Sequence, residues 1–113
     1  MVVTIEAPTR GDLIWLGFDP QKGHEQKGRR PALVLSPREY NEKVGLALMC
    51  PITSKKKGYP FEVGLPDDCP VSGVILSDQV ISLDWRSREA EIAGTVPSDT
   101  LSEVLRKLYT LLN

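Results

Sequence analysis

The chain has 113 residues, of which 41% are hydrophobic and 26% are charged, and its formal net charge is −1. This globular composition excludes a disordered chain, and the length predicts one domain over residues 1–113 rather than two. No apolar run approaches the ~20 residues that a membrane-spanning helix needs, so no membrane association is expected. The N-terminus lacks the charged-then-apolar order of a signal peptide, which favours a cytoplasmic location.

Short apolar segments between glycines and prolines predict a series of strands. In chain order they cover residues 12–18, 32–36, 45–53, 61–65, 71–76 and 79–83. Pro31 opens the second of them, and Pro51 marks the third as an edge strand or a bulged one. A helical turn is expected over residues 38–43, and a weaker alternation over 85–92 is broken at Gly94.

The last segment changes to the period of a helix. Its apolar residues fall on one face: Leu101, Val104, Leu105, Leu108, Leu111 and Leu112. Ser98 or Thr100 is expected to cap its start, since Thr100 and Glu103 have the spacing of a capping box. Five to seven short strands followed by one amphipathic helix predict a mainly β fold, a small and strongly curved sheet or barrel with the helix packed on it.

A polar segment, DPQKGHEQKGRRP over residues 19–31, separates the first two predicted strands. A long polar segment between buried strands is where a small domain places binding or catalysis. Residues 19–30 contain four basic and two acidic side chains, and Lys55, Lys56 and Lys57 follow the third strand. If the two segments adjoin, they form a basic patch suited to a polyanion; the alternative is that the lysines are ordinary solvated residues.

Common catalytic and metal-binding patterns are missing from the sequence. It contains one histidine, His24, and two cysteines, Cys50 and Cys69, without the spacing of a zinc site, so we expect no metal and no cofactor. Both cysteines are expected to be free thiols, with a disulfide between them as the alternative. Cys50 and Met49 belong to an apolar run and are expected in the core.

With those catalytic patterns missing, the chemistry that the sequence still allows is charge stabilisation by arginine. Arg30 directly precedes the second predicted strand, which defines its position. Its planar cationic fork fits phosphate oxygens and can stabilise charge that develops at a phosphorus centre. With RNA as the substrate, the substrate's own 2′-hydroxyl could be the nucleophile, and the protein would need neither a nucleophile nor a metal. The alternative for Arg30 is a structural ion pair that anchors the polar segment.

Three blocks of the sequence, in this order, resemble the signature blocks of the MazF/PemK/Kid toxins of bacterial toxin–antitoxin systems: GDLIWLGFDPQKGHEQKGRRPALVLSP, CPITSKKKGYPFEV and GVILSDQVISLDWR. The resemblance implies an SH3-like barrel, a homodimer and a metal-independent endoribonuclease. Such an enzyme cleaves single-stranded RNA at short sequences and leaves a 2′,3′-cyclic phosphate and a 5′-hydroxyl. The resemblance also implies an antitoxin whose acidic, disordered C-terminal segment blocks the RNA site.

The resemblance assigns roles by position in these blocks. It places the catalytic arginine at Arg30 and the catalytic threonine at Thr53, whose hydroxyl would hold a phosphate oxygen or orient the 2′-hydroxyl. Glu25 matches a glutamate of the polar segment and is expected in the catalytic set, either as a general base or as a partner of Arg29 that orders the segment. His24 stands where relatives often carry a serine.

Further residues are expected to bind RNA. Gln79 matches a glutamine that contributes to RNA binding in relatives. Together with the basic side chains, the expected RNA-binding set is His24, Lys27, Arg29, Lys55, Lys56 and Gln79. Trp15, Trp85 and Tyr59 could stack on bases, but tryptophans beside apolar runs are usually core residues, and we expect both of them there.

Two other functions stay open from the sequence. One is a toxin of the same barrel fold that binds DNA gyrase without catalysis, as CcdB-like proteins do. The other is an SH3-like binding module with no activity. The arginine-containing segment and the CPITS block favour the endoribonuclease, because the gyrase poisons resemble this chain in fold and not in those motifs.

Overall fold

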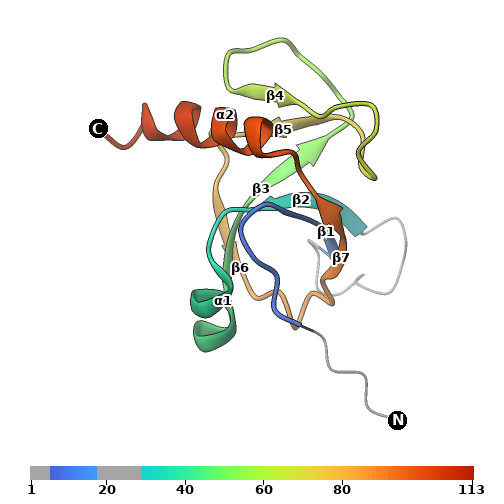
Figure 1. Cartoon of the computed structure of the whole chain (residues 1–113), viewed down its shortest axis with the longest axis vertical. Helices are drawn as coiled ribbons and strands as arrows, with labels where there is room; N and C mark the ends of the chain where they lie inside the picture. The colour runs from blue at the N-terminus through green and yellow to red at the C-terminus, as the bar shows by residue number, and fades with distance from the viewer. Residues whose placement is uncertain (1–5, 18–28) are drawn as a thin grey trace.

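The computed structural model describes residues 6–17 and 29–113 (Figure 1). Within these ranges the elements are β1 (Asp12–Gly17), β2 (Arg29–Val34), α1 (Arg38–Val44), β3 (Ala47–Thr53), β4 (Glu62–Gly64), β5 (Val74–Leu76), β6 (Ile81–Leu83), β7 (Glu91–Thr95) and α2 (Ser98–Tyr109). The predicted mainly β fold with a C-terminal helix is confirmed. No helix in the described ranges is both long and apolar enough to cross a membrane.

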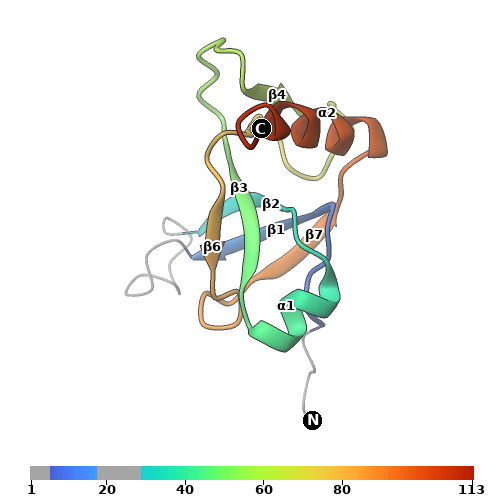
Figure 2. The ribbon, with the colours of Figure 1, turned by 90° about the vertical axis from the view of Figure 1, so that its left-hand side faces the viewer.

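The strands pair antiparallel in the order β4-β5-β3-β2-β1-β7, with β6 also paired to β3. The result is a strongly curved, open sheet in which β3 runs alongside β6, its hydrogen-bonded neighbour (Figure 2). α2 lies next to β4 at one end of the molecule, and α1 lies at the opposite end (Figures 1 and 2).

The sheet buries side chains on both faces, because successive residues of a strand point to opposite sides. Leu13 and Leu33 contribute to a core that includes Val104 of α2, whereas Ile14 and Ala32 contribute to a second core on the other face. The two cores also contain Cys50 and Ile75 in the first and Met49 and Trp85 in the second. The expected core positions of Cys50, Met49 and Trp85 are confirmed, and β1, β2 and β3 form the rigid centre of the fold.

The third predicted strand is central, and its placement at an edge is wrong. β3 pairs with β2 on one side, where Ala32 faces Pro51, and on the other side it pairs with β6 through Ala47–Met49 and with β5 through Ile52–Thr53. Pro51 therefore lies where β3 changes partner. A residue without an N–H group is tolerated there because no continuous ladder runs past it on that side.

The second strand begins earlier than predicted, at Arg29 instead of Ala32. Pro31 lies inside β2, opposite Trp15 of β1. Pairing between β2 and β3 reaches only as far as Ala32, so Pro31 has a ladder on one side alone and its missing donor is tolerated. The consequence for the site is that Arg30 is a strand residue, with its backbone opposite Leu16.

Gly94 does not break the last strand as predicted; it lies within β7, opposite Leu13. A Cβ atom at this position would lie 2.9 Å from Cγ of Pro70, so the close approach of the Pro70 ring requires a glycine.

β5 also begins later than predicted, at Val74. It follows Gly73, which has a φ of +125°, and a Cβ there would lie 2.4 Å from the carbonyl oxygen of Thr53.

The predicted cap of the last helix is wrong. α2 begins directly after Pro97, and among the described residues no side chain caps it. Thr100 is buried in the first turn, where its N–H donates to Asp99 Oδ1 at 2.9 Å. The predicted apolar face packs on the sheet through Val104, whereas Leu112, beyond the end of α2, is 68% exposed.

Candidate functional site

A pocket of about 490 Å³ lies beside the start of β2 and the end of β3, next to Trp15 of β1. Its described lining includes Trp15, Arg29, Arg30, Thr53, Lys55 and Pro70. Three of these side chains are cationic and none is acidic. The pocket therefore favours an anion.

Arg30 and Thr53 line the same pocket from the neighbouring strands β2 and β3. Ala32 of β2 faces Pro51 of β3, and the two strands are antiparallel. The pairing of β2 with β3 ends at these two residues. Arg30 precedes Ala32 by two residues and Thr53 follows Pro51 by two, so side-chain alternation directs both to the same face of the sheet. Both line the pocket. A guanidinium and a hydroxyl in this arrangement can together contact one phosphate group.

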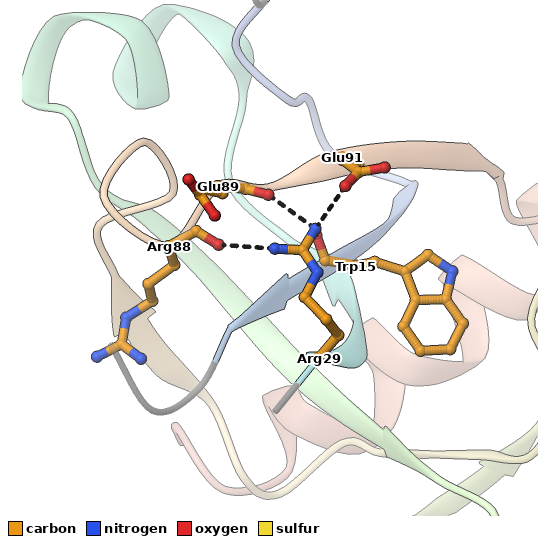
Figure 3. Close-up of polar contacts among 5 residues, drawn as sticks. All are labelled: Trp15, Arg29, Arg88, Glu89 and Glu91. Atoms are coloured by element: carbon orange, nitrogen blue, oxygen red, sulfur yellow. Dashed lines mark hydrogen bonds and ion pairs between the residues drawn. The ribbon is translucent and has the colours of Figure 1, made fainter. Parts of the chain in front are cut away.

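The two neighbouring arginines differ in their surroundings. The Arg29 side chain is 14% exposed, and its guanidinium donates to the carbonyl oxygens of Trp15 (3.2 Å), Arg88 (3.3 Å) and Glu89 (2.8 Å). It also forms an ion pair with the Glu91 carboxylate at 2.9 Å (Figure 3). This is the anchoring role considered above for Arg30.

Arg30 is exposed, and within the described ranges its side chain makes no hydrogen bond or ion pair. Its backbone is nevertheless fixed by the pairing with Leu16. A cation on a rigid backbone at the wall of a pocket is suited to bind an incoming anion.

The lysine segment, residues 55–57, starts at the wall of the same pocket. Lys55 lines it together with Arg29 and Arg30, so the described ends of the two basic segments adjoin. A second pocket of about 180 Å³ shares Thr53 and Lys55 with the first. Its other described lining residues are Lys57, Tyr59, Glu62, Leu76 and Gln79. Lys56 is exposed and lines neither of these pockets.

The backbone of the lysine segment is held by Glu62. Its carboxylate accepts hydrogen bonds from the N–H groups of Lys57 at 2.9 Å and Gly58 at 2.8 Å. The adjoining Tyr59 hydroxyl donates to Asp78 Oδ1 at 2.8 Å. Desolvation, followed by this hydrogen bond, raises the pKa of Tyr59, which keeps its hydroxyl protonated at neutral pH and unsuited to act as a base.

Three of the predicted site residues, His24, Glu25 and Lys27, lie outside the described residues. In the part of the chain that is described, no group of three His, Cys, Asp or Glu side chains could hold a metal ion. Cys50 and Cys69 are free thiols, so they form no disulfide. Burial, with a smaller contribution from the charge of Asp78, raises the pKa of Cys50 to about 12, which removes it as a nucleophile.

Sequence reasoning missed two features of the site. Trp15 was expected in the core but is 37% exposed and lines the pocket, whereas Trp85 is buried and donates from Nε1 to the Asn41 carbonyl at 2.9 Å. The alternation of buried Ile14 and Leu16 around Trp15 was the available signal. Glu91, the partner of Arg29, could not be found from any local pattern.

The fold and the pocket define a small, curved antiparallel β protein with a cationic pocket beside its central strands. A family model described as PemK-like, MazF-like toxin of type II toxin-antitoxin system matches residues 9–112. The chain belongs to this family, which confirms the resemblance found in the sequence.

Individual relatives are similar over almost the whole chain. The endoribonuclease toxin MazF of Escherichia coli (strain K12) is 49% identical over 111 residues, which cover 98% of this chain and 99% of the relative. The endoribonuclease toxin ChpB of the same organism is 36% identical, over 91% of this chain and 92% of the relative. A crystal structure of MazE–MazF from Deinococcus radiodurans has 57% sequence identity and a TM-score of 0.86, covering 94% of this chain and 96% of that one.

Proposed function

We propose that the chain is a sequence-specific endoribonuclease toxin that cleaves single-stranded RNA without a metal ion, and so inhibits translation and growth. One toxin domain, residues 1–113, would carry the activity in the cytoplasm, where messenger RNA is present. The observation that carries the proposal is that Arg30 and Thr53 both line one cationic pocket. Relatives at 49% and 36% identity that are named endoribonucleases support it.

The reaction needs only the substrate and side chains of this chain. The 2′-hydroxyl of the RNA attacks the adjacent phosphorus, the bond to the 5′-oxygen breaks, and a 2′,3′-cyclic phosphate and a 5′-hydroxyl are formed. Arg30 contacts the phosphate oxygens and stabilises the negative charge that grows there. The Thr53 hydroxyl holds a phosphate oxygen or orients the 2′-hydroxyl, because a threonine is too weak a base to remove the proton itself. Glu25 is the candidate general base.

Lysines and one amide extend the contact along the RNA. Lys55 lines the pocket of Arg30, and Lys56 follows it on an exposed segment. Gln79 lines the adjoining pocket, where its amide can hydrogen-bond a base edge next to the cleaved bond. His24 and Lys27 complete the proposed RNA-binding set. Binding of this kind depends on phosphate neutralisation and weakens with added salt.

A cognate antitoxin neutralises the toxin. A structural relative is described as a complex of MazE with MazF. For this chain we propose a partner with an acidic, disordered C-terminal segment, since a cationic pocket that accepts the RNA backbone also accepts carboxylates. Such a segment would compete directly with RNA.

The toxin is also proposed to be a homodimer. An apolar surface groove of about 330 Å³ lies between α2 and β3. It is lined by Arg10, Leu35, Leu48, Val80, Leu105, Leu108, Tyr109 and Leu112. Several of these apolar side chains are at least one-third exposed in the single chain. A two-fold interface places the same apolar patch on both copies, which would cover these side chains.

The test is incubation of the purified protein with a mixed-sequence single-stranded RNA in chelator, with the fragment ends mapped. Cyclic-phosphate ends at a recurring short sequence are expected, and they should be lost in Arg30→Ala and Thr53→Ala. Intact RNA from the folded wild type would contradict the proposal. Trapped gyrase–DNA breaks in a parallel assay would then identify the gyrase-binding alternative, and their absence would leave the binding module.

A further inference from the structure

The turn between β6 and β7 is hydrogen-bonded to the end of β1 and to the start of β2, beside the pocket. The Gly17 N–H at the end of β1 donates to the Arg88 carbonyl at 3.0 Å, and Arg88 Nη1 donates back to the Gly17 carbonyl at 3.1 Å. Arg29 at the start of β2 donates to the same Arg88 carbonyl. Gly17 and Arg29 are themselves opposite each other in the ladder. One turn therefore fixes both strand ends.

The turn is itself rigidly built. Asp84 Oδ1 accepts the N–H groups of Arg86 at 3.1 Å and Ser87 at 3.0 Å, and the Ala90 N–H donates to the Trp85 carbonyl at 3.0 Å. The Trp85 side chain is 1% exposed and packs in the core. A continuous set of contacts thus runs from the core through the turn to Arg29.

Both terminal nitrogens of the Arg29 guanidinium donate to protein oxygens. Three acceptors are backbone carbonyls, and the fourth is the Glu91 carboxylate. Arg88 and Glu89 of the turn and Glu91 of β7 face the guanidinium, and the Trp15 indole ring extends away from it (Figure 3). A phosphate that bound both terminal nitrogens would have to compete with these acceptors. A lysine at this position could not replace Arg29, because an ammonium is a point charge that cannot reach all four acceptors.

We infer that Arg29 is a positioning residue, which fixes the backbone of Arg30 against the β6–β7 turn, and that it is not a ligand of the RNA phosphates. This inference rests on the proposed function and replaces the RNA contact that the sequence predicted for Arg29. Arg30 is the next residue in β2, and its approach to the scissile phosphate has to be accurate to within about 1 Å for full activity. Loosening Arg29 therefore affects the catalytic step more than binding.

Arg29→Lys separates the two roles because it keeps the charge and removes the fork. Single-turnover cleavage at saturating protein should fall at least tenfold, while RNA affinity changes less than about twofold. Arg29→Ala should leave the dependence of log affinity on log salt unchanged. The matched control, Lys55→Ala, should lower that slope by about 0.7, the value for one contact to a single strand. A full cleavage rate in Arg29→Lys, or a lowered slope in Arg29→Ala, would overturn the inference.

Glu91→Ala is the second variant. It tests the positioning role of Arg29 if thermal unfolding shows that Arg29→Lys is unfolded at the assay temperature. It removes one of four acceptors and leaves the charge of Arg29 in place. A severalfold slower cleavage step with an unchanged salt slope is expected, and a wild-type rate would overturn the inference. Wild-type protein is measured alongside. Failure of the wild type to cleave would count against the proposed function instead.

Discussion

The hydroxyl oxygen of Thr53 accepts a hydrogen bond from the backbone N–H of Lys55 at 3.1 Å. This contact closes a tight turn at the start of the lysine segment. It occupies an acceptor position of the hydroxyl and leaves its hydrogen available. Thr53 can therefore donate to a phosphate oxygen while it positions Lys55.

Thr53→Val tests this donor, because valine keeps the shape of the side chain and removes the oxygen. The cleavage rate should fall about 10²- to 10³-fold, the effect of removing one donor to a developing charge. Thermal unfolding should report a loss of only about 1 kcal/mol for the hydrogen bond to Lys55. Thr53→Ser is the control and should stay within tenfold of the wild type. Equal activity in the valine and serine variants would exclude a role for the hydroxyl.

Arg30→Ala should abolish cleavage and leave the fold intact. The side chain is exposed and makes no hydrogen bond or ion pair to the described residues, so the free energy of unfolding should change by no more than about 0.5 kcal/mol. Arg30→Lys should bind RNA nearly as well and cleave it much more slowly, since the planar fork is lost. Single-turnover rates together with circular dichroism check both statements. Substantial cleavage by a folded Arg30→Ala variant would remove Arg30 from the mechanism.

The sequence predicted the mainly β fold and the general positions of its elements, because apolar alternation and glycine or proline breaks act locally. Its errors came from contacts over long distances in the chain. Gly94 looked like a break because nothing in its neighbourhood reveals the ring of Pro70 packed against it. Pro51 looked like an edge residue because the change of partner strands along β3 is a property of the whole sheet.

The candidate site shows the same division. Arg30 and Thr53 stand in recognisable motifs, and both line the same pocket. The role of Arg29 could not be predicted, because its acceptors at Arg88, Glu89 and Glu91 lie about sixty residues away in the chain. Only the pairing of β1 with β7 brings that turn to the site.

Asn41→Ala should destabilise the protein strongly. Asn41 is fully buried, its Nδ2 donates to the carbonyls of Pro8 at 2.7 Å and Ser36 at 3.0 Å, and its Oδ1 accepts from the Ser36 hydroxyl. Each partner left buried and unpaired costs about 1–3 kcal/mol, so a total loss of about 3 kcal/mol is expected. Urea unfolding measures it, with Glu42→Ala on the same helix as the exposed control. A loss below about 1 kcal/mol would show that water replaces the amide.

Cys50 should make the protein less stable at high pH. Burial raises the pKa of its thiol from 9.0 to about 12, so the unfolded chain loses this proton at a lower pH than the folded chain does. Stability from this group is therefore complete below pH 9 and falls as the pH rises toward 12. Between pH 9 and 11 the wild type should lose about 2 kcal/mol more than Cys50→Ala, in which the other titrating groups are the same. Parallel pH profiles of urea unfolding would contradict this.

The proposed homodimer can be tested on the apolar groove beside α2. Leu112 lines this groove and is 68% exposed, so Leu112→Asp introduces a charge without disturbing the core. A two-fold interface would bury an unpaired carboxylate from each copy. The cost of burying two charges should convert the protein to a monomer at micromolar concentration. Light scattering measures the mass, and Val44→Asp, at an equally apolar and 50% exposed position on α1, is the control. A wild-type monomer would contradict the dimer, and a Leu112→Asp variant that stays dimeric would place the interface elsewhere.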